Sequence, residues 1–456
     1  MKKRLKHYIL LLIFLLSVTA CERKPNEITE SSSHVTTVSG HVSTELIEVL
    51  NEKRTLTMSD RFVRPALRTA IERFCAAYPS VEIVVNNYDG DYEAFELQTY
   101  TKLMAGDADD IIRALGFSDM KLFDSGLLAD FYPLMQNDLS FKKDDYFLNV
   151  FKGSEYHGKL YTFPINFMYE VIGINNSFSG GLAAQFHQYS TVSYRQMLDL
   201  YDGLTDKGGR CVQKDMSALY TIIESLNMYI DYENKTCDFN NDSFIRFIID
   251  MKNAGIPMTI DEYESASFTE AEMEEEAQQY LFRSTNPTRN ALSVFFPYID
   301  EKAYSHYIPL VDEKGNLMFG SEYSLCISEA SENKELAWEF IKFLTTEEAN
   351  QGQNLSPCFP VHKKFYNTSV FAGVTASVEN LELIGTINGE AGEVVTSVMN
   401  TLASYHEMPM IWIQTPASVV DIILESLTNF YMGTQTAEQV ASALQNKMLL
   451  YLMEMM

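Results

Sequence analysis

Residues 56–112 have the sequence LTMSDRFVRPALRTAIERFCAAYPSVEIVVNNYDGDYEAFELQTYTKLMAGDADDII, in which short β-branched runs alternate with segments of helical period. We expect strands at 56–58, at 81–85 and from Asp110 onward. Helices are expected at 65–77, at 93–104 with Gly106 ending it, and near 119–125. Strands that alternate with helices form parallel βαβ units whose helices cover the sheet. This stretch therefore predicts an α/β fold.

The second half of the chain alternates less regularly. Its apolar spacing indicates helices at 194–204 and 243–253 and a strand at 292–296. Thr436 and Gln439 form a capping box that opens a C-terminal helix. With 456 residues, the chain exceeds what one hydrophobic core usually supports. We therefore expect two lobes.

The first 20 residues are typical of a secretory signal peptide. Four cationic residues within positions 2–6 precede an apolar run at 8–16. This run is shorter than the roughly 20 residues of a membrane-spanning helix, and a short anchor helix is the alternative interpretation. Residues 18–21, Val-Thr-Ala-Cys, resemble the processing box of bacterial lipoproteins, which implies that Cys21 is lipidated. Residues 21–52 are then expected to be the lipidated cysteine and a flexible tether.

The composition and the absent motifs exclude several functions. The chain has 35 Lys and Arg against 62 Asp and Glu, a net charge of −27, whereas binding to nucleic acid needs a cationic surface. The sequence lacks the GxxxxGK[ST], HExxH and GxSxG motifs of nucleotide hydrolases, zinc hydrolases and serine hydrolases. We therefore expect no enzyme activity, no cofactor and no bound metal.

The remaining cysteines and one acidic segment have no assigned role. Five cysteines follow the signal region, an odd number without the CxxC spacing of metal sites. Cys75 and Cys326 are expected to be small buried hydrophobic residues, and pairing of Cys211 with Cys237 stays open. Segment 261–276 is interpreted as a solvated acidic face, with a calcium site or a basic partner as the alternatives.

Three blocks carry a resemblance to a known family. They are KLMAGDADDII with GLLADFYPL (102–112 and 126–134), GKLYTFP with IGINNSF (158–164 and 172–178), and YIPLVDEKG with SENKELAWEFIKFLTTEEAN (307–315 and 331–350). Together, and in this order, they resemble extracellular solute-binding proteins of bacterial ABC importers, the group that contains maltose- and oligosaccharide-binding proteins.

This resemblance implies a two-lobed periplasmic-binding-protein-like fold with the ligand cleft between the lobes. Lobe one would hold 53–168 and 325–372, and lobe two 169–324 and 373–456. The protein would be a monomeric lipoprotein on the outer face of the bacterial cell membrane. It would capture a sugar or oligosaccharide by lobe closure and deliver it to the ABC permease.

The candidate ligand contacts are the residues that follow the expected strands, because open α/β sheets bind ligands at the carboxyl ends of their strands. Three of them lie in the crossover after Pro164, where the family often places ligand contacts. Trp412 resembles the family's stacking aromatic, and a core position is its alternative. The full set is Ser59, Asp60, Tyr88, Asp89, Gly116, Phe117, Ser118, Asn166, Phe167, Tyr169, Tyr298 and Trp412.

Two other functions remain open at this point. A lipid-anchored extracytoplasmic glycosidase would need two converging carboxyl groups, one of them with a perturbed pKa. A solute sensor for a membrane receptor kinase would share the fold and differ in its partner surface.

Overall fold

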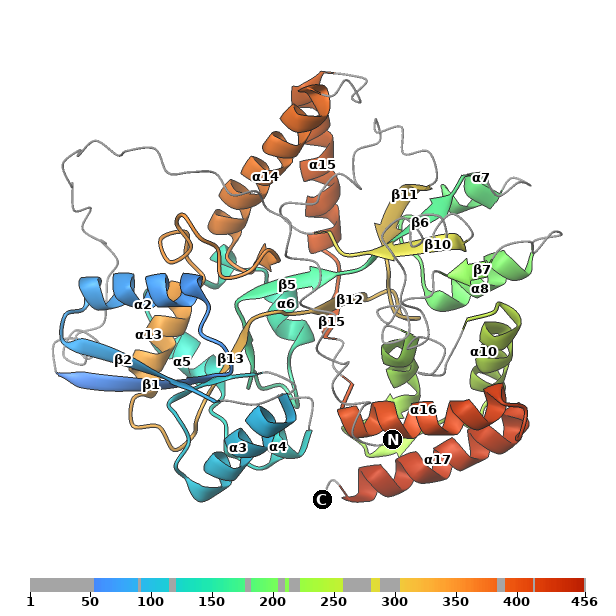
Figure 1. Cartoon of the computed structure of the whole chain (residues 1–456), viewed down its shortest axis with the longest axis horizontal. Helices are drawn as coiled ribbons and strands as arrows, with labels where there is room; N and C mark the ends of the chain where they lie inside the picture. The colour runs from blue at the N-terminus through green and yellow to red at the C-terminus, as the bar shows by residue number, and fades with distance from the viewer. Residues whose placement is uncertain are drawn as a thin grey trace.

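The computed structural model describes residues 53–88, 92–114, 120–176, 182–203, 210–212, 222–256, 280–287, 304–383, 390–412 and 415–454. These residues form a mixed α/β structure with two lobes, each built around its own sheet (Figure 1). The predicted signal peptide and tether, segment 261–276 and the expected strand at 292–296 lie outside the described residues. In the part of the chain that the structure describes, no helix combines the length and the apolar character that crossing a membrane requires.

The first lobe is built on a five-stranded sheet. Its strands, in spatial order, are β2 (Val81–Asn87), β1 (Arg54–Asp60), β3 (Ile111–Arg113), β13 (Ser324–Ile327) and β4 (Phe163–Pro164). β1 pairs in parallel with β2 and with β3, as the alternating pattern predicted. β13 is antiparallel to β3 and returns the chain from the far half of the sequence. Because β1, β2 and β3 run in one direction, their carboxyl ends meet at one edge.

Helices cover both faces of this sheet. They are α2 (Pro65–Ala77), α3 (Tyr92–Ala105), α4 (Met120–Asp124), α5 (Phe131–Asn137), α6 (Leu148–Gly153) and α13 (Lys334–Leu344). On one face, Phe74 of α2 packs edge-on against Phe340 of α13, with ring centroids 5.1 Å apart. On the other face, Leu103 of α3 and Leu122 of α4 pack with Cys326 of β13. Gly106 follows α3 with φ +70°, a left-handed conformation that ends the helix at low cost.

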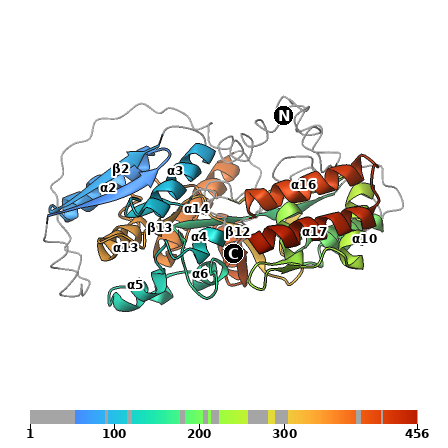
Figure 2. The same cartoon turned by 90° about the horizontal axis from the view of Figure 1, so that it is seen from below.

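The second lobe has a four-stranded sheet and a separate core. Its strands, in spatial order, are β11 (Tyr304–Pro309), β6 (Val171–Asn175), β10 (Tyr280–Thr285) and β7 (Arg210–Val212). Its helices are α7 (Leu182–Phe186), α8 (Tyr194–Asp202), α10 (Asp242–Asn253), α16 (Ala417–Tyr431) and α17 (Ala437–Glu454). α16 and α17 lie side by side (Figure 2) and contribute buried leucines and valines to this core.

Local sequence rules account for these helices. Ser193 and Gln196 form a capping box that starts α8, and the predicted box of Thr436 and Gln439 is present before α17. On α10, the predicted apolar residues Phe244, Phe247, Ile248 and Met251 are all buried. The sequence therefore determined these helices through spacing and caps.

A third sheet lies where the chain passes between the lobes. Its strands, in spatial order, are β14 (Phe359–Pro360), β5 (Asn166–Tyr169), β12 (Leu317–Gly320) and β15 (Met410–Trp412). A hairpin of α14 (Lys363–Leu383) and α15 (Ala391–His406) projects beside it (Figure 1). The smaller elements are η2 (Lys143–Asp145), η3 (Leu226–Tyr229), β8 (Ile230–Asp231) and β9 (Thr236–Cys237).

Val374, Val398 and Leu402 of the hairpin pack in the core of the first lobe, although the sequence assigns residues 373–456 to lobe two, and the lobe boundaries stay a prediction. One sequence-based expectation needs correction. Cys75 is only half-buried, whereas Cys326 is buried as predicted. The thiols of Cys211 and Cys237 are free, so the open question of their pairing is answered in the negative.

Candidate ligand site at the carboxyl edge of the first sheet

Asp60 ends β1 at this edge and is almost fully buried, with 2% of its surface exposed. Its Oδ2 atom lies 3.6 Å from Nη1 of Arg113, at the end of β3, and accepts a hydrogen bond from the Tyr323 hydroxyl at 3.2 Å. The Arg113 guanidinium also lies over the Tyr323 ring, 3.6 Å from its centroid. Burial, together with the charge of Asp60, raises the pKa of Tyr323, so the phenol stays protonated and donates.

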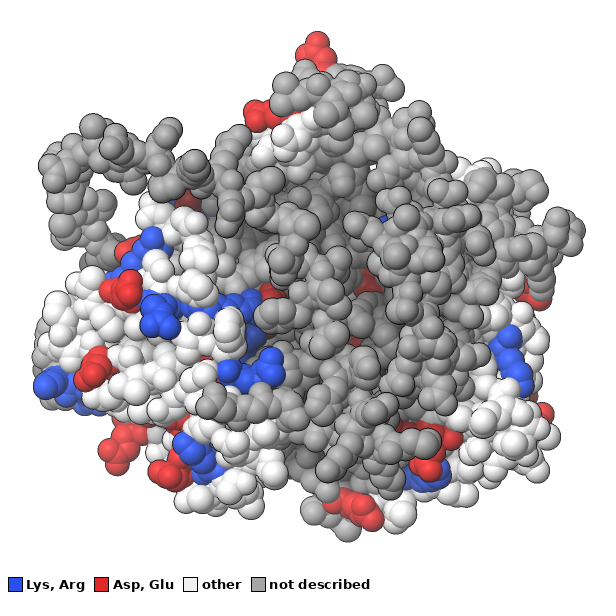
Figure 3. Space-filling model, viewed as in Figure 1, with Lys and Arg blue, Asp and Glu red and all other residues white. Residues whose placement is uncertain are grey.

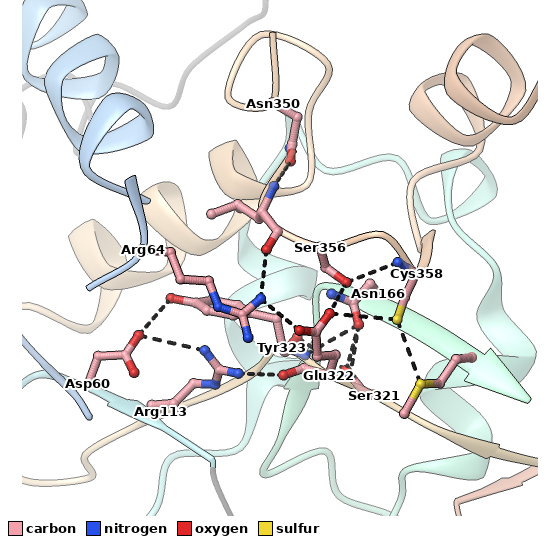
Figure 4. A network of polar contacts seen from close by, with 12 residues as sticks. Asp60, Arg64, Arg113, Asn166, Ser321, Glu322, Tyr323, Asn350, Ser356 and Cys358 are labelled. Atoms are coloured by element: carbon pink, nitrogen blue, oxygen red, sulfur yellow. Dashed lines mark hydrogen bonds and ion pairs between the residues drawn. The ribbon is translucent and has the colours of Figure 1, made fainter. Parts of the chain in front are cut away.

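Glu322 connects this edge to the start of α2 and to the segment before β14 (Figure 4). One carboxylate oxygen lies 2.7 Å from Nη1 of Arg64, and the other accepts from the Ser356 hydroxyl. Arg64 also donates to the Leu355 carbonyl at 3.1 Å. Burial alone would lower the pKa of Arg64, but the charge and hydrogen bond of Glu322 outweigh it and raise that pKa.

Asn166 fixes the segment that leads into β13. Its Oδ1 accepts from the backbone N–H groups of Glu322 at 3.0 Å and Tyr323 at 3.3 Å, and from the Ser321 hydroxyl at 3.3 Å. We call these connected side chains the edge network: Asp60, Arg64, Arg113, Asn166, Glu322, Tyr323 and Ser356. It connects β1, β3 and β5 with residues 321–323, which lead into β13, and with Ser356, which precedes β14.

Several buried donors at this edge lack a hydrogen-bond partner among the residues that the structure describes. They are the Ser59 hydroxyl, Nε of Arg113, Nδ2 of Asn166 and the Ser324 hydroxyl, on residues that are at most 3% exposed. An unpaired buried polar group costs about 1–3 kcal/mol. Such groups gather where a protein uses them to bind water or a ligand. Asn166 and Ser356 also line a small pocket together with Asn350.

A second polar cluster lies at the end of β2. Oδ1 of Asp109 accepts from Asn86 at 2.5 Å, and Oδ2 accepts from the Tyr88 hydroxyl at 2.9 Å. Lys102 donates to the same hydroxyl and lies 4.8 Å from the centroid of the Tyr88 ring. Burial is the main cause that raises the pKa of Tyr88. Both the ring and the hydroxyl of this predicted contact are therefore already engaged.

Apart from Tyr88, the structure separates the predicted contacts into three groups. Ser59, Asp60 and Asn166 come together at the edge. Phe167 and Tyr169 are buried in the first core, and their role as ligand contacts stays a prediction. Trp412 is half-buried beside Phe319, with ring centroids 5.5 Å apart, which favours its core alternative. Outside the described residues lie Asp89, Gly116, Phe117, Ser118 and Tyr298.

A pair of carboxyl groups lies on the second-lobe side. Glu170, between β5 and β6, is 9% exposed and accepts from the Ser284 hydroxyl. Burial, and then the charge of Glu170, raise the pKa of Glu224 well above its usual range. Among the described residues, no group of three or more His, Cys, Asp or Glu side chains is arranged to hold a metal ion.

Sequence reasoning missed Arg64, Arg113, Glu322 and Tyr323. Their partners lie up to 291 residues away in the sequence, as in the bond from Arg64 to Leu355. Arg113 is the last residue of β3, so its position at a strand end is a signal that could have identified it. No sequence pattern signals Glu322, because its role depends on the antiparallel return of β13.

Comparisons with known proteins agree with this architecture. Residues 69–374, more than half of the chain, match the model of the family described as bacterial extracellular solute-binding protein. None of the curated proteins compared with the chain matches it.

Among solved structures, a periplasmic oligogalacturonide-binding protein from Yersinia enterocolitica is 13% identical, with TM-score 0.60, over 88% of this chain and all of that one. A de novo designed esterase is 14% identical, with TM-score 0.58, over 88% of this chain and 99% of that one. A family 1 extracellular solute-binding protein from Alicyclobacillus acidocaldarius is 15% identical, with TM-score 0.55, over 88% of this chain and 99% of that one. At these identities the likeness concerns the fold alone. The family match settles the classification: the chain belongs to the bacterial extracellular solute-binding proteins.

Proposed function

We propose that the protein captures a sugar or short oligosaccharide outside the cell and delivers it to the permease of an ABC importer. The observation that carries this proposal is the family match over residues 69–374. The likeness to an oligogalacturonide-binding protein supports a carbohydrate as the ligand class. The predicted signal and Cys21 support an extracytoplasmic, lipid-anchored protein, and we propose that it acts as a monomer.

The ligand is proposed to bind between the lobes, against the carboxyl edge of the first sheet. The edge network cross-links this side by hydrogen bonds and ion pairs, so closure would move the second lobe toward it. A ligand drives such closure only to the extent that it binds the closed form better than the open one. Unpaired donors such as the Ser59 hydroxyl and Nδ2 of Asn166 suit the hydroxyl groups of a sugar.

The charge of the ligand is a separate question. The chain as a whole is strongly acidic, yet in Figure 3 Lys and Arg side chains gather on the part of the first lobe where Figure 1 shows α2. Arg64 and Arg113 belong to this side of the molecule. A test of the ligand class therefore has to include uronic as well as neutral sugars.

A thermal-shift screen tests the proposal. Digalacturonate, trigalacturonate, maltotriose and cellotriose are each added to the purified protein, with a peptide and a polyamine as controls. A ligand at 100 times its Kd stabilises the folded state by about 2.7 kcal/mol, which raises the melting temperature measurably. If no sugar raises it while the peptide or the polyamine does, the carbohydrate proposal is wrong.

Glycoside hydrolysis is the second candidate, because Glu170 and Glu224 provide a carboxyl pair in which one pKa is raised. Chromatography of each sugar after incubation separates the two functions. A binding protein returns the sugar intact, whereas a hydrolase yields fragments and loses this activity in Glu224→Gln.

A further inference from the structure

Phe62 is an exposed phenylalanine in the turn that follows β1. It is 55% exposed, and Phe371 on α14, 52% exposed, is the other phenylalanine with such exposure in the described part of the chain. Phe62 lies two residues beyond Asp60, and its backbone N–H donates to Oδ1 of that residue at 3.4 Å. The backbone of Phe62 is therefore tied to the edge network, and its ring is exposed.

The turn that carries Phe62 is held on both sides. With its amide oriented to satisfy its hydrogen bonds, Asn87 donates to the carbonyls of Asp60 at 3.3 Å and Arg61 at 2.8 Å. On the other side, Arg64 is fixed by Glu322 and by the Leu355 carbonyl. Pro65 then begins α2 and restricts the backbone further. An aromatic ring on such a backbone loses little conformational freedom when it contacts a ligand.

The other aromatic residues considered for this edge have different partners. Phe167 and Tyr169 pack in the first core, and Tyr88 is engaged by Lys102 and by Phe95, with ring centroids 5.7 Å apart. Trp412 packs beside Phe319. Phe62 is the aromatic among these that combines a position at the edge with an exposed ring.

The geometry points to Phe62 as a ligand-stacking residue that selects a hexopyranose ring by its apolar face. This inference rests on the proposed function and adds a specificity determinant to it. A pyranose has one face of C–H groups and a rim of hydroxyls. The flat Phe62 ring would cover the C–H face, while the unpaired donors beside β1 would take hydroxyls at the rim.

The test measures affinity by isothermal titration for the tightest binder among digalacturonate, trigalacturonate, maltotriose and cellotriose. Covering about 50 Å² of sugar face corresponds to about 1 kcal/mol, so Phe62→Ala should weaken binding roughly five- to tenfold. Phe62→Trp should retain the wild-type affinity, and Phe62→Leu should lose most of it because leucine has no flat face. Phe371→Ala is the matched control, equally exposed but on α14, and should bind within about twofold of wild type.

Melting temperatures accompany each titration. Because the Phe62 ring is exposed, Phe62→Ala should melt within about 2 °C of wild type. The inference is overturned if wild-type protein binds a sugar and Phe62→Ala binds it equally well. It is also overturned if Phe62→Ala lowers the melting temperature strongly, because the ring would then be part of the core. If wild-type protein binds none of the four sugars, the proposed function fails and this inference fails with it.

Discussion

The end of β1 and the strand β5 both contact Tyr323, and they are built from opposite kinds of side chain. At the end of β1, Asp60 pairs with Arg113 and accepts from the Tyr323 hydroxyl. β5 binds the Tyr323 backbone through Asn166, but its rings at Phe167 and Tyr169 are buried.

The difference follows from how each strand is placed. β1 ends at the carboxyl edge of the first sheet, where the backbone leaves the sheet. Some polar groups at this edge therefore keep donors without a partner among the described residues. β5 pairs on both sides, with β14 and β12, and its rings enclose a buried histidine. His406 lies with its ring centroid 5.0 Å from Phe167 and 4.9 Å from Phe359, and its Nε2 lies 3.0 Å from the Tyr169 hydroxyl. The end of β1 thus carries the polar groups of the proposed ligand site, whereas β5 holds the structure together.

Truncating an aromatic side chain of β5 should give the largest loss of stability. Phe167→Ala leaves a cavity among Phe147, Phe359 and His406 and should lower the free energy of unfolding by about 3–5 kcal/mol. Urea unfolding measures this loss. Sugar affinity of the folded fraction should stay within about twofold of wild type, the reverse of the result expected for Phe62→Ala. A selective loss of affinity with normal stability would place Phe167 in the ligand site after all.

Lowering the pH should reduce the stability of the folded protein through His406, which packs beside β5. Burial lowers the pKa of this imidazole to about 3, whereas the unfolded chain titrates near 6.5. Between these values the unfolded state binds a proton that the folded state does not, so stability falls as the pH falls through this window. At pH 4 the cost is about 3 kcal/mol, and above pH 6.5 it vanishes.

Urea unfolding at pH 7, 5.5 and 4 checks this prediction. His406→Gln carries no titratable group and should lose less stability than wild type between pH 6.5 and 4. Exposed His157 serves as the control, and His157→Gln should follow the wild-type curve. Identical pH curves for wild type and His406→Gln would show that the imidazole is not a buried neutral group.

The smallest loss of stability is expected for a substitution in the edge network. Glu322→Gln keeps a hydrogen-bond acceptor but removes the charge that faces Arg64, whose side chain is 25% exposed. Solvent screening limits the cost to about 1 kcal/mol. Glu329→Gln is the matched control, because its ion pair with Lys334 is more exposed and should matter by less than about 0.5 kcal/mol. Equal melting temperatures for both variants would mean that Glu322 does not hold the returning segments.

The sequence predicted the helix bounds, apolar spacing and caps, because these depend on residues close together in the chain. The helix at 65–77 matches α2 residue for residue, and the apolar spacing of α10 and the cap of α17 are present as expected. The expectation that ligand contacts follow the carboxyl ends of strands also located Ser59 and Asp60 at the polar edge of the first sheet. The burial of Phe167 and Tyr169 could not be predicted, because the pairing of β5 with β12 and β14 brings together segments about 150 and 190 residues apart, which no local pattern encodes. Phe62 was missed for a different reason, since an aromatic residue in a turn looks like any other loop residue until its exposure is known.

Small-angle X-ray scattering measures whether the lobes close when the ligand binds. The protein is measured alone and with a saturating concentration of its tightest-binding oligosaccharide. A smaller radius of gyration is expected in the bound state, because the second lobe should close onto the edge of the first sheet. An unchanged radius of gyration at demonstrated saturation would contradict this expectation.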